Sequence, residues 1–194
     1  MNDCTAIILA AGKSSRMGQP KLKLLMPDGV SFLDHIVRQY LDVGCEQIIL
    51  VVNAEDSRFL TLDTVSKLDY RIVINEQPEK GRLFSLQKGI NTTEGKGFFF
   101  IQNIDNPFAS PNLLNLLNEN RQKADLIKPV CNGKGGHPVL ISEKIAKYLL
   151  QVNDWKISLK DFLAPYPTFC VGTEDQNILV NINTREDLEK LYLV

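Results

Sequence analysis

Short apolar runs alternate along this chain with segments whose apolar residues recur at helical spacing. A buried strand produces the first pattern, and an amphipathic helix produces the second. In the first half of the chain, the expected strands are Ala6–Ala10, Gln47–Val52, Tyr70–Ile74 and Phe98–Ile101, and the expected helices are Ser31–Val43, Arg58–Leu68, Leu83–Asn91 and Pro111–Lys123. Strands that alternate with helices predict an α/β fold with a mainly parallel sheet.

The same alternation continues in the second half. Further strands are expected at Leu126–Val130, His137–Ile141, Thr168–Val171 and Ile178–Ile182. A glycine-rich link, Asn132–Gly136, separates the first two of these strands and is expected to form a flexible rim. Helices are expected from an N-cap at Ser142 to Leu150, at Ser158–Leu163, and after a capping box that begins at Thr184. Ser110 is the expected N-cap of the helix that starts with Pro111.

The composition limits the class of protein. The 194 residues, of which 44% are hydrophobic, suit one globular domain spanning residues 1–194. The 22 Lys and Arg residues nearly balance the 23 Asp and Glu residues, which argues against a nucleic acid partner. The chain shows no signal-peptide pattern and no run of about 18 apolar residues, so a cytoplasmic protein outside the membrane is expected. The four widely spaced cysteines are expected to be buried free thiols.

The first apolar run leads directly into a loop of small and cationic residues, Ala11–Lys21. Loops at the carboxyl ends of parallel strands form the ligand crevice of an open sheet, and small residues there let the backbone approach a ligand closely. Arg16 and Lys21 add two positive charges, which favours phosphate as the ligand. A solvated basic loop is the alternative that charge alone leaves open.

Two common phosphate motifs do not account for this loop. Gly12-Lys13-Ser14 resembles the end of a P-loop, but Ile7, inside the strand, stands where the first glycine of that motif belongs. The dinucleotide fingerprint G-x-G-x-x-G is absent as well, because serines follow Gly12 where further glycines would be needed.

The stretch from Leu9 to Leu22, L-A-A-G-x-S-x-R-M-G-x-P-K-L, resembles the signature of the nucleotidyltransferases similar to the molybdenum cofactor guanylyl- and cytidylyltransferases. The resemblance implies a doubly wound, Rossmann-like fold with three α/β/α layers. It also implies that a nucleoside triphosphate is wrapped by Leu9, Ala10, Ala11, Gly12, Arg16 and Lys21. Asn75 with Gly81–Leu86 resembles the family's N-x(5)-G-x-x-x-S-L segment, which implies that Asn75 and Ser85 contact the nucleotide. Arg82 replaces a small or apolar residue that is common in the family.

A carboxylate follows the Phe98–Ile101 run at Asp105. Mg²⁺ is commonly held by one or two carboxylates together with substrate phosphates, so this single Asp suits a magnesium site. The D-x-P turn at Asp105 resembles the family's metal-binding turn, while an Asx turn before Pro107 is the alternative. Arg16, Lys21 and Asp105 are therefore the predicted catalytic residues.

The segment Asn181–Leu188 resembles the family's closing motif N-x-N-T-P-E-D-L, with Arg185 in place of proline. The resemblance implies that Asn183 is a second metal ligand, weaker than a carboxylate. A helix entrance with Asn183 beside the cap is the alternative.

The resemblance gives conflicting indications for the substrates. Ala11 accompanies cytidine or uridine nucleotides in related enzymes, so CTP is the expected nucleotide. The Asn-Ile-Asn ending is more typical of guanylyltransferases and leaves GTP as the alternative. Gly136–Leu140 resembles the G-H-P-V-L segment at the acceptor side, but Asn153–Asp161 departs from the cytidylyltransferase pattern, so the acceptor pocket differs in part. A lone histidine such as His137 is more often structural.

The expected reaction is the transfer of a nucleoside monophosphate to a phosphorylated small molecule, with release of pyrophosphate. Molybdopterin and a sugar phosphate are both open as acceptors. A non-catalytic nucleotide sensor is the alternative of another class.

Overall fold

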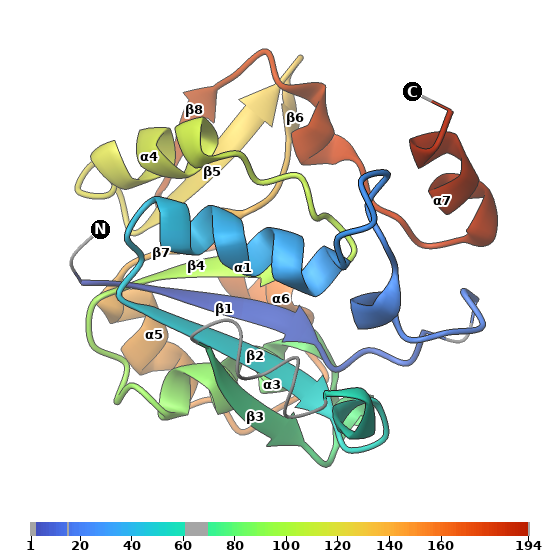
Figure 1. Ribbon diagram of the computed structural model, residues 1–194. Helices are drawn as coiled ribbons and strands as arrows, with labels where there is room; N and C mark the ends of the chain where they lie inside the picture. Colours follow the sequence, from blue (N-terminus) through green and yellow to red (C-terminus); the bar gives the residue numbers. More distant parts are fainter. Residues whose placement is uncertain (1–2, 15, 61–69, 194) are drawn as a thin grey trace.

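The computed structural model describes residues 3–14, 16–60 and 70–193. Among these residues, one sheet of 8 strands runs through the protein (Figure 1). Its order is β3 (Arg71–Asn75), β2 (Gln47–Asn53), β1 (Cys4–Ala10), β4 (Phe98–Asn103), β7 (Val139–Ile141), β5 (Leu126–Cys131) and β6 (Lys134–Gly135), with β8 (Thr168–Gly172) paired to β5. Parallel pairs join β1 to β2 and β4, β2 to β3, and β5 to β8, whereas β7 and β6 run antiparallel to their neighbours. This mixed, mainly parallel sheet confirms the α/β prediction.

Helices cover both faces of the sheet (Figure 1). α1 (Phe32–Asp42) and α4 (Pro111–Glu119) lie on one face, and α3 (Gly81–Asn91), α5 (Glu143–Leu150) and α6 (Leu159–Leu163) lie on the other. Along β1, Ile8 and Ala10 pack in the same core as α1, while Ile7 and Leu9 pack in the same core as α3. Alternate side chains of a strand point to opposite faces, so β1 is buried on both sides. The three layers confirm the doubly wound arrangement.

Shorter elements complete the described chain. Four 3₁₀ helices are described, η1 (Lys21–Lys23), η2 (Asp56–Phe59), η3 (Pro78–Lys80) and η4 (Gln176–Leu179), and the last α-helix is α7 (Arg185–Leu191). α7 packs against the α1 side of the core, and the hydroxyl of Tyr192 donates to the carbonyl of Leu25 at 2.8 Å. No helix in the described ranges has both the length and the apolar character needed to cross a membrane. The cytoplasmic location stays a prediction.

Local capping explains where several helices begin. Ser110 accepts a hydrogen bond from the backbone N–H of Leu113, and Pro111 opens α4, as predicted. Thr184 and Asp187 form the predicted capping box of α7. α5 begins after Ser142, but the Ser142 hydroxyl donates to Asp125 instead of capping the helix.

The strand expected at Ile178–Ile182 is wrong. The chain there forms η4 and then an irregular segment, with Ile178 and Ile182 buried. The amide of Asn106 donates to the carbonyls of Asn177 and Val180, and the N–H of Ile182 donates to the carbonyl of Asp105. These backbone groups therefore bond to the turn that carries Asp105 rather than to a neighbouring strand.

Two further boundaries differ from the sequence expectations. α4 ends at Glu119 rather than Lys123, because the side chain of Asn120 donates to the carbonyl of Leu116 and turns the chain. The strand expected from His137 begins at Val139, since Pro138 has no N–H to pair.

The link Asn132–Gly136, expected to be a flexible rim, contains a hairpin strand. Asn132 and Gly133 have φ angles of 50° and 75°, and this left-handed Asn-Gly turn pairs β6 with β5. Of the helix expected at Arg58–Leu68, the described residues show only η2, and positions 61–69 lie outside the described part of the chain.

Three of the four cysteines are buried, but Cys170 is exposed, which corrects the expectation of four buried thiols. Its neighbours Phe169 and Val171 pack against the core, so the alternation of β8 turns Cys170 to solvent.

Burial raises the pKa of Cys45 to about 12 and also raises that of Cys4. Because the thiolate is the reactive form, a thiol reagent is expected to modify one cysteine rapidly in the native protein and all four after unfolding. A second fast native thiol would contradict this burial pattern.

Candidate active site

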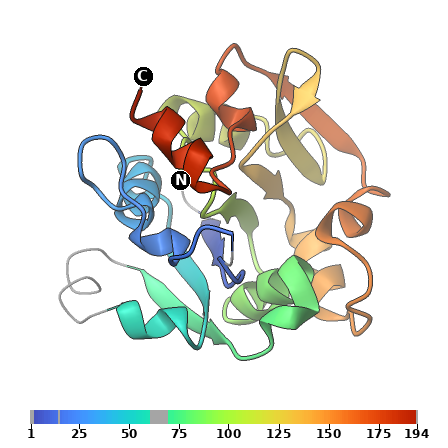
Figure 2. The same cartoon turned by 90° about the vertical axis from the view of Figure 1, so that its right-hand side faces the viewer.

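The carboxyl ends of four parallel strands meet at one edge of the sheet, which Figure 2 views end-on. β2, β3 and β4 each end in an asparagine, namely Asn53, Asn75 and Asn103. Asn53 lies opposite Asn75, and Asn103 lies opposite Leu9 of β1. The loop that follows β1 therefore begins beside a row of buried amides.

The first loop folds back on itself so that Lys21 returns to this edge. The carbonyl of Ser14 accepts hydrogen bonds from the N–H groups of Met17 and Gly18, and the Ser14 hydroxyl accepts one from the N–H of Lys21 at 3.3 Å. Met17 and Leu22 are buried in the core and anchor the loop on both sides of Gly18. The space beside Gly12 is open, because a Cβ atom built there would have no heavy atom within 4 Å apart from those of Gly12 and its two chain neighbours.

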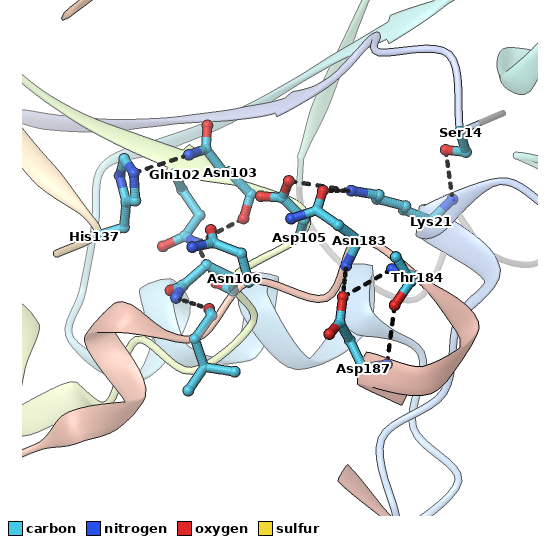
Figure 3. A network of polar contacts seen from close by, with 12 residues as sticks. Ser14, Lys21, Gln102, Asn103, Asp105, Asn106, His137, Asn183, Thr184 and Asp187 are labelled. Atoms are coloured by element: carbon cyan, nitrogen blue, oxygen red, sulfur yellow. Dashed lines mark hydrogen bonds and ion pairs between the residues drawn. The ribbon is translucent and has the colours of Figure 1, made fainter. Parts of the chain in front are cut away.

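Lys21 joins two distant parts of the chain (Figure 3). Its Nζ donates to Asp105 Oδ2 at 3.1 Å and to Asn183 Oδ1 at 2.7 Å. Asp105 is 6% exposed, and its other oxygen, Oδ1, is buried with no hydrogen-bond partner among the described residues. The site thus has a largely desolvated carboxylate, one oxygen of which has no hydrogen-bond partner among the described residues.

The turn before α7 holds Asn183 in place. Asp187 accepts hydrogen bonds from the N–H groups of Asn183 and Thr184, at 3.0 and 2.9 Å, and these bonds hold the pKa of Asp187 below its usual value. The N–H of Ile182 donates to the backbone carbonyl of Asp105 at 2.7 Å. The closing turn is therefore tied directly to the turn that carries the carboxylate.

A cavity of about 170 Å³ lies over this cluster. Its walls include Leu9, Ala11, Gly12, Arg16, Lys21, Ser85, Asp105 and Asn183.

Two residues of the predicted site do not line this cavity. Ala10 points into the α1 side of the core, and Asn75 is fully buried behind Ser85, to whose hydroxyl it donates at 3.0 Å. Asn75 can therefore position Ser85 but not line the cavity.

Sequence reasoning did not single out Asn53 or Asn103. Asn53 donates to the carbonyl of Ala11 at 3.3 Å and so fixes the start of the first loop. Asn103 lines the cavity, and its Nδ2 lies 3.2 Å from His137 Nε2. A signal for both was present, since Asn53 directly follows an apolar run, as Asn75 does, and Asn103 lies two positions after the run Phe98–Ile101.

A second, larger cleft of about 1030 Å³ adjoins the first. Arg82 and Asn103 line both hollows. The second cleft extends over β5 and β7 to a wall formed by residues 155–164, where Trp155 lies edge-on against Phe84 with ring centroids 4.8 Å apart. His137 lies in this cleft, with a buried Nδ1 that has no described partner.

His137 makes stability depend on pH. Burial lowers its pKa below 6.5, Asp105 opposes this shift, and Arg82 adds to it. Below pH 6.5 the folded protein therefore binds fewer protons at His137 than the unfolded chain does. As a result, the free energy of unfolding has its full value above pH 6.5 and decreases as the pH falls below it. His137→Gln is expected to reduce this slope in urea unfolding measured at several pH values. Part of the slope should remain, because burial also lowers the pKa of His35. An unchanged slope would contradict the assignment.

The fold is that of a doubly wound α/β protein, with a polar cavity at the carboxyl ends of its parallel strands. Residues 6–168 match the family described as "MobA-like NTP transferase domain", and the chain belongs to that family of nucleotidyltransferases. A probable molybdenum cofactor guanylyltransferase from Carboxydothermus hydrogenoformans is 27% identical, over 100% of this chain and 98% of its own length. The molybdenum cofactor cytidylyltransferase of Escherichia coli is 27% identical, over 95% and 92%. The crystal structure of Rv0371c from Mycobacterium tuberculosis in complex with manganese has a TM-score of 0.75 at 18% identity, covering 99% of both chains.

Proposed function

We propose that residues 1–194 act as one domain that transfers a nucleoside monophosphate from a nucleoside triphosphate to a phosphorylated small molecule. Molybdopterin is the first acceptor to test, since the guanylyl- and cytidylyltransferase relatives are named for the molybdenum cofactor. The observation that carries the proposal is the contact of Lys21 with both Asp105 and Asn183 beside the open Gly12 turn. Positive charge, a buried carboxylate and room for phosphate lie together there.

The chemistry needs positioning and charge neutralisation more than a base. An oxygen of the acceptor phosphate attacks the α-phosphorus of the nucleotide, and a new P–O–P linkage forms. The bond from the α-phosphorus to the oxygen that bridges to the β-phosphorus breaks, and pyrophosphate leaves with the electron pair. The attacking phosphate is already an anion, so no proton needs to be removed. Arg16 and Lys21 line the cavity and are proposed to hold the β- and γ-phosphates as negative charge builds on them.

The residues present fit Mg²⁺. Asp105 offers a buried Oδ1 without a partner, and Asn183 offers an amide oxygen that accepts from the same Lys21 ammonium as Asp105. No group of three His, Cys, Asp or Glu side chains suited to a metal occurs among the described residues. One carboxylate and one amide match an ion that substrate phosphates also ligate, and the manganese complex of Rv0371c supports a divalent cation in this fold. When bound, the ion would neutralise charge on the phosphate oxygens.

GTP is proposed ahead of CTP as the nucleotide. Ala11 favours a pyrimidine, but the Asn181-Ile182-Asn183 ending favours GTP. Relatives from Carboxydothermus and Bacillus species named as probable molybdenum cofactor guanylyltransferases, and a molybdenum cofactor guanylyltransferase from Haemophilus influenzae, support GTP.

A panel experiment tests the function. Pyrophosphate release is measured with GTP, CTP, UTP or ATP, each with Mg²⁺ and with or without molybdopterin. We expect acceptor-dependent release that is fastest with GTP. Fastest release with CTP would establish the pyrimidine alternative. Tight nucleotide binding without any release, across molybdopterin and a panel of sugar phosphates, would contradict the transferase and favour a sensor.

A further inference from the structure

We propose that Arg82 holds the attacking phosphate of the acceptor at the junction of the two clefts. The inference rests on the proposed transfer reaction and names the residue that brings the two substrates together. It also restricts the acceptor to an anion with an apolar body.

Among the described residues, Arg82 is the one cationic residue that lines both the cavity and the larger cleft. It lines the cavity beside Lys21 and Asp105, and it lines the larger cleft beside His137 and Trp155. It is exposed, and it makes no hydrogen bond or ion pair with a described residue. A guanidinium in this position is free to bind a ligand that enters from the larger cleft.

The local electrostatics favour an anion at Arg82. Arg82 lies in the first turn of α3, which has no acidic residue there, and the N-cap residue Lys80 makes no side-chain capping bond. The N-terminal end of a helix carries partial positive charge and attracts anions. Lys80 and Arg82 add two cations to this end of α3, and an anion bound between them would offset the repulsion. By contrast, side chains cap α1, α4, α6 and α7.

The rest of the larger cleft has the same sign of charge. Its described lining includes one carboxylate, Glu79, and five cations, which are Lys80, Arg82, Lys128, Lys156 and Lys160. Apolar side chains such as Leu126, Val139 and Trp155 also line this cleft. Such a lining suits a phosphate monoester whose phosphate meets Arg82 while its apolar or planar body extends toward Trp155.

The geometry of arginine fits this task. A guanidinium donates two parallel N–H bonds to two oxygens of one phosphate, which leaves the third oxygen free to attack the α-phosphorus. Lysine carries the same charge but only as a point, so it cannot fix the orientation of the phosphate. Relative to Arg82→Ala, the Arg82→Lys variant should therefore recover binding of the acceptor to a greater extent than it recovers turnover.

The first arm of the test measures binding without turnover. Trp155 is the single tryptophan of the chain and lines only the larger of the two adjoining clefts, so its fluorescence reports on the acceptor side. Phenyl phosphate is titrated into the protein saturated with a GTP analogue that has a methylene group between the α- and β-phosphorus. Arg82→Ala is expected to weaken phenyl phosphate binding by about ten- to a hundredfold, the range for a hydrogen bond to a charged group. Arg38→Ala, an exposed arginine on α1, is the matched control and should not change it.

The second arm separates the two substrates. In steady-state pyrophosphate release, Arg82→Ala should raise KM for molybdopterin and lower kcat, while calorimetry should give a Kd for the GTP analogue within about twofold of wild type. If the analogue loses affinity tenfold, Arg82 belongs to the nucleotide site and the proposal fails. It also fails if phenyl phosphate binds Arg82→Ala as well as it binds wild type. If wild type releases no pyrophosphate but binds phenyl phosphate through Arg82, the reaction is wrong while the anion site stands.

Discussion

Lys21→Met is expected to lower turnover by on the order of a hundredfold or more, while strengthening the binding of Mn²⁺ to the nucleotide-free protein. The ammonium of Lys21 lies 3.1 Å from Asp105 Oδ2 and 2.7 Å from Asn183 Oδ1, the two residues proposed to hold the metal. Methionine has a similar length without the charge, so the substitution removes a cation that repels the metal. It also removes the two hydrogen bonds that Lys21 donates to the proposed metal ligands. Turnover falls because the leaving phosphates lose a positive partner.

Two measurements check this result together. Free Mn²⁺ is followed by electron paramagnetic resonance during titration of the nucleotide-free protein, and pyrophosphate release gives the turnover. Lys23→Met is the matched control, because Lys23 is exposed on the same 3₁₀ helix, with its Nζ over the ring of Phe59. Weaker Mn²⁺ binding to Lys21→Met, or full turnover, would contradict the assignment of Lys21.

Asp105→Asn is expected to lower turnover by on the order of a hundredfold and to remove the effect of Mg²⁺ on nucleotide affinity. The substitution keeps the shape of the side chain but removes the charge that would hold the ion. The backbone carbonyl of Asp105 still accepts the N–H of Ile182, so the closing turn keeps its anchor. Calorimetry with a non-hydrolysable GTP analogue, with and without Mg²⁺, measures the change.

Asp42→Asn is the control for charge, because Asp42 is exposed at the end of α1 and far from the cavity lining in sequence. It should leave both the turnover and the Mg²⁺ effect as in wild type. The metal assignment would be wrong if Mg²⁺ tightened analogue binding equally in Asp105→Asn and wild type.

Helix starts and most strands can be predicted here because their signals are local. Ser110 followed by Pro111, and Thr184 followed by Asp187, carry their own capping partners within one turn. The segment at Ile178–Ile182 shows the limit of such reasoning. Its apolar residues resemble a strand, but the carbonyl of Val180 accepts a hydrogen bond from the side chain of Asn106, 74 positions away in the sequence.

The candidate site shows the same division between local and distant information. The loop after β1 and the carboxylate at Asp105 can each be found from the residues around them. The contact between Lys21 and Asn183 spans 162 positions, and it exists only because the closing turn is tied to the turn of Asp105. The pairing of Asn103 with His137 likewise depends on β7 lying beside β4 in the sheet.

The fate of the α-phosphate tests nucleotidyl transfer most directly. The protein is incubated with Mg²⁺, molybdopterin and GTP labelled with ³²P at either the α or the γ position, and the products are separated. We expect the α label to enter the acceptor product and the γ label to leave in pyrophosphate. Transfer of the γ label to the acceptor, or its release as orthophosphate with the α label left in GDP, would contradict it.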